Sequence, residues 1–184
     1  MTATDKTGKE NDHVIPTYDR LIFVGDSRTV QLEMAVSYNR SKTVFIGESG
    51  MGYQWFSDTA VYQVDGQLGP YDSAIIINMG VNDLADVKQY AKLVNRKAAE
   101  WKLRGAAVYY SSVTPVNDGQ TTVTNAQISE FNETLKELLS ADVYWIDSYS
   151  YLMNNGYTAT DGLHYDKATY KALYAFYHTI VGER

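Results

Sequence analysis

The sequence predicts an α/β fold in which one parallel β-sheet is covered by helices on both faces. Its 184 residues correspond to about one domain. With 45% hydrophobic and 21% charged residues, the composition is that of an ordinary globular chain. Five short apolar runs alternate with segments of helical periodicity, and this alternation indicates parallel strands joined by helices.

The first half of the chain contains three of the apolar runs, each bounded by turn residues and therefore typical of buried strands. They cover residues 20–26, 42–48 and 73–81. A helix is expected between the first two, over about 29–38. The stretch 49–70 is rich in glycine, so we expect irregular structure there, with a helical turn around 53–60.

The clearest helix precedes the fourth strand. Its apolar stripe has alternating spacings of four and three residues and consists of Val87, Ala91, Val94, Ala98 and Trp101. Gly105 is expected to end this helix. The fourth strand is predicted at 106–113 and ends before Pro115.

Two more helices and a strand complete the pattern. Thr124 and Gln127 have the spacing of a capping box and begin a helix. Residues 143–146 form the fifth predicted strand. Asp166 is expected to cap the last helix. The residues expected to face inward from these two helices are Ile128, Phe131, Leu135, Leu138, Tyr170, Leu173 or Tyr174, Tyr177 and Val181.

Ligands of open parallel sheets bind at the carboxyl ends of the strands, so residues that follow strands are the first site candidates. Ser27 follows the first strand, where its hydroxyl and backbone N–H can face a reacting group, although a helix cap is the alternative. Gly50 and Gly52 follow the second strand, where glycine allows a ligand to come close to the backbone N–H groups; a plain turn is the alternative. Asn82 and Asp83 follow the third strand. The Asn82 side-chain amide can donate to an oxyanion, and a role as turn residues is the alternative for this pair.

A fourth candidate precedes the last helix. Neutral imidazole is a good general base near pH 7, and a carboxylate on its other nitrogen fixes its tautomer. Of the three histidines, His13 lies in the polar leader and His178 lies beside an apolar helix stripe. His164 is therefore the candidate base, with Asp161 as its orienting acid; a surface turn is the alternative for this pair.

Taken together, these residues resemble the motif blocks of the SGNH hydrolases, also called the GDSL esterase/lipase family. The blocks appear in order as Gly25-Asp26-Ser27, Gly47-x-Ser-Gly50, Gly80-x-Asn82-Asp83 and Asp161-x-x-His164. The resemblance spans residues 20–166. It implies a flavodoxin-like three-layer α/β/α sandwich whose five-stranded parallel sheet has the order 2-1-3-4-5.

The same resemblance implies the roles of the site residues. Ser27 would be the nucleophile, His164 the base and Asp161 its orienting acid. The oxyanion hole would be formed by the backbone N–H groups of Ser27 and Gly50 and the side-chain amide of Asn82. Gly52 is a second candidate for the glycine N–H.

Arg28 departs from the family pattern, which often has an apolar residue at this position. We expect it either to meet an anionic group of the substrate or to pair with an acid such as Asp83 or Glu33, and we favour the pairing. The aromatic residues near the blocks are candidates for lining a substrate cleft. The candidate substrate-binding residues are Arg28, Gly52, Tyr53, Trp55, Asp83 and Tyr165.

The predicted function is that of a serine esterase acting on short acyl groups, with acetyl the first choice, on a carbohydrate. Sixteen tyrosines fit stacking on sugars, although core packing is the more common use of tyrosine. A carbohydrate O-acyltransferase with the same residues and a non-catalytic glycan-binding module are the alternatives. The reaction implied by the resemblance requires no metal and no cofactor.

Several properties exclude other classes or leave questions open. The net charge of −6 argues against a nucleic-acid partner, and no apolar run approaches the ~20 residues of a membrane span. The absence of cysteine excludes disulfides and thiolate metal sites. Residues 1–18 are predicted to be a disordered leader or linker before a single domain at 19–184. A stalk left by a removed signal or anchor would slightly favour an extracellular or cell-surface location over the cytoplasm. The oligomeric state is left open.

Overall fold

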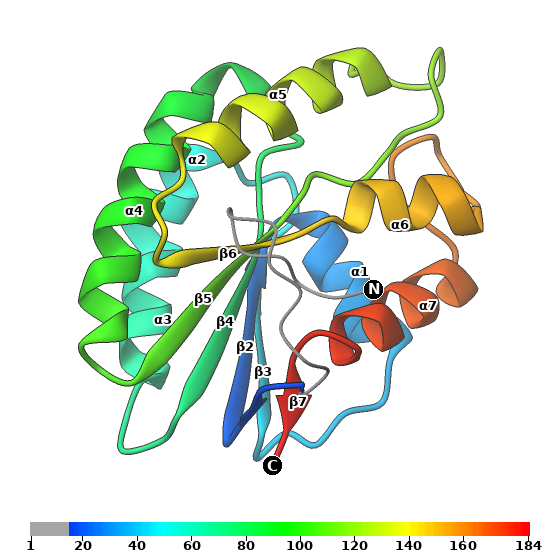
Figure 1. The fold of residues 1–184 in the computed structure, drawn as a ribbon. Helices are drawn as coiled ribbons and strands as arrows, with labels where there is room; N and C mark the ends of the chain where they lie inside the picture. Colours follow the sequence, from blue (N-terminus) through cyan, green and yellow to red (C-terminus); the bar gives the residue numbers. More distant parts are fainter. Residues whose placement is uncertain (1–14) are drawn as a thin grey trace.

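The computed structural model describes residues 15–184 and contains a five-stranded sheet in which every neighbouring pair is parallel. The strand order is β3-β2-β4-β5-β6, which is the predicted order 2-1-3-4-5 when the five strands are counted along the chain (Figure 1). The strands are β2 (Arg20–Gly25), β3 (Thr43–Gly47), β4 (Ser73–Asn78), β5 (Ala106–Ser111) and β6 (Val143–Ile146).

Helices cover both faces of this sheet, so the predicted three-layer arrangement is confirmed (Figure 1). One face packs against α2 (Tyr53–Trp55), α3 (Val61–Gln67), α4 (Val87–Lys102) and α5 (Asn125–Leu138). The other face packs against α1 (Ser27–Ala35), α6 (Ser148–Asn155) and α7 (Lys167–His178). Alternate residues of the central strands supply the two cores: Ile75 and Ile77 face one core, and Ala74 and Ile76 face the other.

The local signals that begin two of the helices are present as predicted. Thr124 caps α5: its hydroxyl accepts from the Gln127 N–H at 3.3 Å, while the Gln127 side chain accepts from the Thr124 N–H at 2.9 Å. Asp166 caps α7 and accepts from the Thr169 N–H at 2.8 Å. The fifth strand has its predicted bounds, Val143–Ile146.

The stretch 49–70 is more regular than predicted. Helical structure runs from α2 through a π-helical segment, η1 (Phe56–Ala60), and then through α3 to Gln67. The prediction of irregular structure is wrong because Phe56, Ala60, Val61 and Val64 form a buried stripe. The glycines at positions 50, 52, 66 and 69 indicated a loop and obscured this stripe.

The ends of the chain and some element boundaries also differ from the prediction. The first helix begins at Ser27 and ends at Ala35, rather than covering 29–38, and the third and fourth strands end at Asn78 and Ser111. Helix α6 was not predicted. Thr17–Tyr18, expected in the leader, form β1, which pairs in parallel with β7 (Gly182–Glu183). The remainder of the expected leader, residues 1–14, lies outside the described residues, as does His13.

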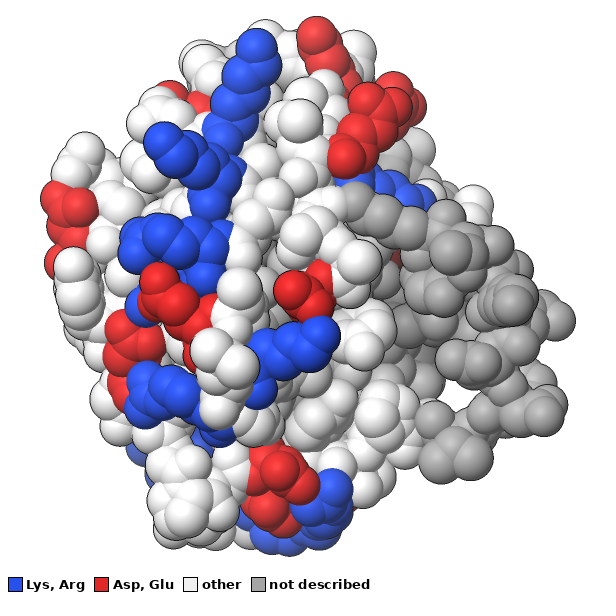
Figure 2. Space-filling model, turned by 60° about the vertical axis from the view of Figure 1, so that its left-hand side comes forward, with Lys and Arg blue, Asp and Glu red and all other residues white. Residues whose placement is uncertain are grey.

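Charged side chains of both signs share the surface around α4. Figure 2 shows basic side chains beside acidic ones on this face. Ion pairs join several of them, including Lys97 with Asp65 at 2.8 Å and Lys102 with Asp142 at 2.6 Å. Within residues 15–184, no helix is long and apolar enough to cross a membrane.

Candidate active site

Ser27 lies at the junction of β2 and α1, as the first residue of the helix. The capping alternative for Ser27 is wrong because Asp26 occupies the cap position and accepts from the Arg28 N–H at 2.9 Å. The tight turn depends on Gly25, where an added Cβ would overlap the Thr29 hydroxyl and the Asn78 carbonyl oxygen. Because Asp26 caps the helix, the Ser27 hydroxyl can contact a side chain from another part of the chain.

That side chain is His164, which lies 137 residues further along the chain. Its Nε2 is 2.8 Å from Ser27 Oγ, and its Nδ1 is 2.7 Å from Asp161 Oδ2. Asp161 Oδ1 also accepts from the N–H groups of Leu163 at 2.9 Å and His164 at 2.7 Å. The structure thus joins serine, imidazole and carboxylate in one hydrogen-bonded chain.

The hydrogen bonds to Asp161 also set its charge. The bond from the His164 backbone N–H, followed by the bond from the ring, lowers the pKa of Asp161 to about 2. The carboxylate is therefore ionised at neutral pH. Its side chain is 56% exposed, and contact with water also favours the charged form. An ionised carboxylate favours the His164 tautomer that carries its proton on Nδ1, which leaves Nε2 able to accept one.

The loops after β3 and β4 lie on the two sides of Ser27, since β2 is between these strands. They are joined by two contacts: Asn82 Nδ2 donates to the Met51 carbonyl at 2.8 Å, and the Tyr53 N–H donates to the Asp83 carboxylate. Gly52 fits closely at this junction, because an added Cβ would collide with Asp83. Both glycine candidates therefore lie in a loop that is fixed to Asn82.

The two glycines differ in their surroundings. Gly50 has a φ of 76°, a left-handed conformation that favours glycine, and open space lies where its Cβ would be. Gly52 faces the Asp83 carboxylate, which also accepts from the Tyr90 hydroxyl at 2.7 Å. Burial raises the pKa of Asp83. Asp83 thus joins the two loops.

Tyr53 and Trp55 line an open depression of about 550 Å³ beside these loops. The depression is also lined by Gly50, Gly52, Asp83, Asp86 and Gln89. Tyr53 packs edge-on against Tyr90 with ring centroids 5.3 Å apart. Aromatic rings beside carboxylate and amide groups are suited to binding a polar ring such as a sugar.

Arg28 and Tyr165 do not lie where the sequence suggested. Arg28 is only 8% exposed, and the expected pairing with Asp83 or Glu33 is wrong: its guanidinium donates to the carbonyl oxygens of Thr114, Pro115 and Leu163. Tyr165 is only 4% exposed and donates its hydroxyl to the Pro115 carbonyl. Both side chains are therefore buried and engaged in contacts within the protein.

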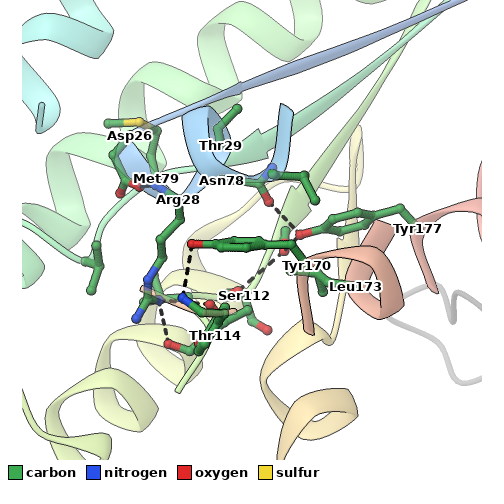
Figure 3. A pocket seen from close by; sticks show the side chains of 15 residues that line it. Asp26, Arg28, Thr29, Asn78, Met79, Ser112, Thr114, Tyr170, Leu173 and Tyr177 are labelled. Carbon is green, nitrogen blue, oxygen red and sulfur yellow. Dashed lines mark hydrogen bonds between the residues drawn. The ribbon is translucent and has the colours of Figure 1, made fainter. Parts of the chain in front are cut away.

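A small buried cavity of about 30 Å³ lies beneath α1, lined by Asp26, Arg28, Asn78, Thr114 and Tyr177 among others (Figure 3). Tyr177 donates its hydroxyl to the Asn78 side chain at 2.8 Å. Burial raises the pKa of Asp26 to about 6, against the opposing effect of the Arg28 charge. Asp26 entered the sequence analysis only as part of a motif, since nothing in the local pattern indicates such deep burial.

Among residues 15–184, no cluster of three or more histidine, aspartate or glutamate side chains is arranged to hold a metal ion. The groups that the structure brings together at this site are a hydroxyl, an imidazole, a carboxylate and nearby amide donors.

Comparisons with known proteins support the fold. No protein-family model and no curated protein matches the chain. Among solved structures, a protein from Streptococcus pneumonia named after platelet activating factor is 22% identical, with a TM-score of 0.69 over 90% of this chain and 83% of its own. The acetylxylan esterase Axe2 from Geobacillus stearothermophilus is 15% identical, with a TM-score of 0.64 over 89% of this chain and 94% of its own.

A lipase/acylhydrolase from Enterococcus faecalis is 18% identical, with a TM-score of 0.60 over 86% of this chain and 93% of its own. At these identities the likeness concerns the fold. The chain thus shares the three-layer α/β/α fold of these structures, and this is the fold that its motif blocks led us to expect.

Proposed function

We propose that this protein is a serine esterase that hydrolyses short-chain acyl esters. The observation that carries the proposal is the hydrogen-bonded chain from Ser27 Oγ through the His164 ring to Asp161, with distances of 2.8 Å and 2.7 Å. A serine is a weak nucleophile alone and needs an adjacent base oriented by a third group. The three residues supply these functions in the required order.

In the proposed reaction, His164 Nε2 takes the proton of the Ser27 hydroxyl as Oγ attacks the ester carbonyl carbon. The tetrahedral intermediate collapses, the carbon–oxygen bond to the alcohol breaks, and His164 returns the proton to the departing alkoxide oxygen. Water then attacks the acyl-enzyme while His164 accepts its proton. Return of that proton to Ser27 Oγ releases the carboxylic acid and restores the enzyme.

The oxyanion of the intermediate would be stabilised by the backbone N–H groups of Ser27 and Gly50 and by the Asn82 amide. Asn82 has two N–H groups, and one donates to Met51, so a second remains for the substrate. The N-terminus of α1 adds a favourable partial positive charge at Ser27. Loss of one such donor typically raises the barrier by about 2.7–4 kcal/mol.

The substrate we propose is an acetylated carbohydrate. The open depression beside the site combines the Tyr53 and Trp55 rings with polar Gln89 and Asp86, a mixture suited to a sugar. The likeness to Axe2, named as an acetylxylan esterase, adds support from the same fold. An acetyl group would occupy the space next to Ser27 while the sugar lies against the aromatic residues.

The proposal is tested with p-nitrophenyl esters from acetyl to decanoyl, using wild type beside Ser27→Ala. We expect turnover that falls with chain length and disappears in the variant. Acetylated xylo-oligosaccharides then test the carbohydrate assignment through release of acetate. Turnover that persists in Ser27→Ala would contradict the assignment. An absence of turnover with all esters would contradict the esterase proposal and direct the next test to acyl transfer or glycan binding.

A further inference from the structure

Arg28 follows the proposed nucleophile directly, yet its side chain points into the protein. Its guanidinium reaches from α1 to Thr114, where it donates to the carbonyl oxygen at 2.7 Å and to the hydroxyl at 2.8 Å (Figure 3). It also donates to the carbonyl oxygens of Pro115 and Leu163, each at 3.2 Å. One side chain therefore contacts two segments that are remote in sequence.

Both neighbours of His164 are held by Arg28. The carbonyl of Leu163 accepts from Arg28 Nε, and the ring of Tyr165 lies under the guanidinium, 5.3 Å from its carbon to the ring centroid. Tyr165 in turn donates its hydroxyl to the carbonyl of Pro115, which also accepts from Arg28. Arg28, Tyr165 and Pro115 thus contact one another beside the loop that carries the His164 imidazole.

The internal contacts of this loop do not fix its position relative to Ser27. Asp161 belongs to the same loop as His164, so their bond orients the ring only within the loop. The Asn117 N–H donates to the Gly162 carbonyl at 2.9 Å, which attaches the loop to the segment after β5. Within residues 15–184, two hydrogen bonds join α1 to the loop: Ser27 with His164, and Arg28 with Leu163.

We propose that Arg28 is a positioning residue that holds the histidine loop at hydrogen-bonding distance from Ser27. This inference rests on the proposed function, in which that distance governs proton transfer. The guanidinium forms no ion pair within the described residues, and its partners are backbone and hydroxyl oxygens. A planar fork of donors can bind several oxygens and stack on a ring, whereas the lysine ammonium lacks this geometry.

The test compares Arg28→Lys and Arg28→Met with a matched control, Arg20→Met. Arg20 also donates to a backbone carbonyl, that of Gln67 at 3.0 Å, and lies over the Tyr71 ring at 4.7 Å. It is at the opposite end of β2 from Ser27, so its loss perturbs packing without touching the site. Thermal melts establish a temperature at which each variant is folded.

Two measurements are then made on the folded variants. We expect kcat for p-nitrophenyl acetate to fall by about 10- to 100-fold in both Arg28 variants with KM little changed, because misplacement by ~1 Å costs about this much. Arg20→Met keeps the wild-type kcat. The second readout is the ¹⁵N chemical shift of His164 Nε2, which reports its hydrogen bond with Ser27 without requiring turnover.

Ser27→Ala supplies the chemical shift of His164 without that bond. We expect both Arg28 variants to move toward this value and Arg20→Met to keep the wild-type shift. Wild-type kcat and shift in folded Arg28 variants would overturn the inference. If wild type hydrolyses no ester, the proposed function fails, and the shift alone decides the role of Arg28. If neither of these Arg28 variants folds, Arg28→Gln, which keeps an amide donor but removes the guanidinium fork, decides in the same way: a shift toward Ser27→Ala supports the role, and the wild-type shift overturns it.

Discussion

Replacing Asp161 by asparagine tests how the imidazole is held. Asp161 Oδ1 accepts two backbone N–H groups, and Oδ2 faces His164 Nδ1. The asparagine oxygen can keep the two backbone bonds, which places its NH₂ group against Nδ1. The ring must then accept at Nδ1 and carry its proton on Nε2, where it can no longer take a proton from Ser27.

The expected loss in kcat is about 10⁴-fold, which corresponds to about 5.5 kcal/mol of barrier. A backbone carbonyl that also accepted from Nδ1 would reduce this loss. Within the described residues, however, Asp161 is the hydrogen-bond partner of Nδ1. The full effect is therefore expected, with little change in KM, because the substitution changes the tautomer and leaves the substrate surface intact.

The assay measures kcat for p-nitrophenyl acetate in wild type, Asp161→Asn and a control, Asp166→Asn. Asp166 caps α7 through the same kind of backbone hydrogen bond but does not contact His164. We expect the control to lose some stability and to keep its kcat. If Asp161→Asn retained more than about a tenth of the wild-type kcat, the tautomer argument would be refuted.

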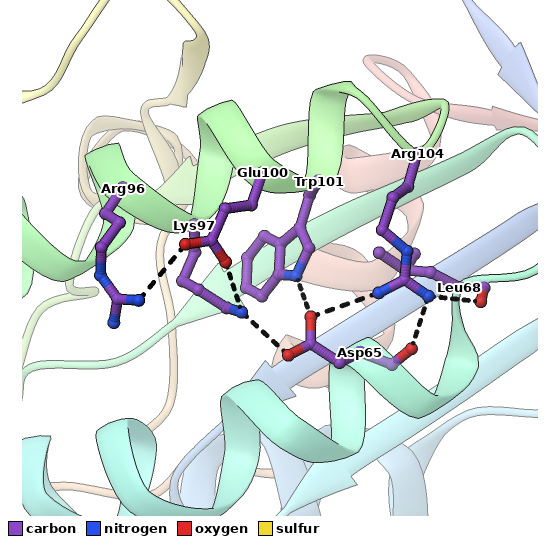
Figure 4. Close-up of polar contacts among 7 residues, drawn as sticks. All are labelled: Asp65, Leu68, Arg96, Lys97, Glu100, Trp101 and Arg104. Atoms are coloured by element: carbon purple, nitrogen blue, oxygen red, sulfur yellow. Dashed lines mark hydrogen bonds and ion pairs between the residues drawn. The ribbon is translucent and has the colours of Figure 1, made fainter.

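Three further predictions concern Asp26, Trp101 and Gly52. Burial raises the pKa of Asp26 to about 6, so its contribution to stability is present below about pH 4 and is lost as the pH rises through about 6. In urea unfolding, Asp26→Asn should therefore gain up to about 3 kcal/mol relative to wild type between about pH 4 and about pH 7. Trp101→Phe removes the indole N–H that donates to Asp65 at 2.6 Å (Figure 4) and should cost about 2 kcal/mol in the same assay without changing kcat. Gly52→Ala places a methyl group against Asp83 and should lower kcat/KM about tenfold or more by displacing the loop of the proposed oxyanion hole.

Each of these has a result that would count against it. A pH-independent stability difference for Asp26→Asn would show that folding does not raise the pKa of Asp26. A change in kcat for Trp101→Phe would contradict the prediction that the hydrogen bond between Trp101 and Asp65 does not affect the active site. Gly66→Ala is the control for Gly52→Ala, since nothing lies within 4 Å of the added methyl group. Equal activity of the two glycine variants would contradict the role given to the loop.

The strands and several helices could be predicted because their signals are local. The run 143–146 has sharp apolar boundaries, and the α4 stripe repeats regularly from Val87 to Trp101. Helix α3 was missed because the glycines at positions 50, 52, 66 and 69 made the stretch resemble a loop. Helix α6 was missed because it is short and Leu152 is its one fully buried apolar residue.

The candidate site also contains residues that could be predicted from the sequence and contacts that could not. The motif residues Ser27, Asn82, Asp161 and His164 could be singled out from the chemistry of their side chains and from their positions, after strands for the first two and before the last helix for the other two. The partners of Arg28 could not be predicted, because they are backbone carbonyls and a hydroxyl brought close by the fold. A carbonyl oxygen is present at every residue, so the sequence does not indicate which carbonyl oxygens accept a hydrogen bond from a side chain.

The most direct test of the central claim, that His164 activates Ser27 as a nucleophile, is covalent labelling with a small fluorophosphonate. Wild type, Ser27→Ala and His164→Ala are treated alike, and the modified peptide is identified by mass spectrometry. The account predicts one adduct per chain, on Ser27, with labelling abolished in Ser27→Ala and strongly slowed in His164→Ala. An adduct on another residue, or labelling of Ser27 at the same rate without His164, would contradict it.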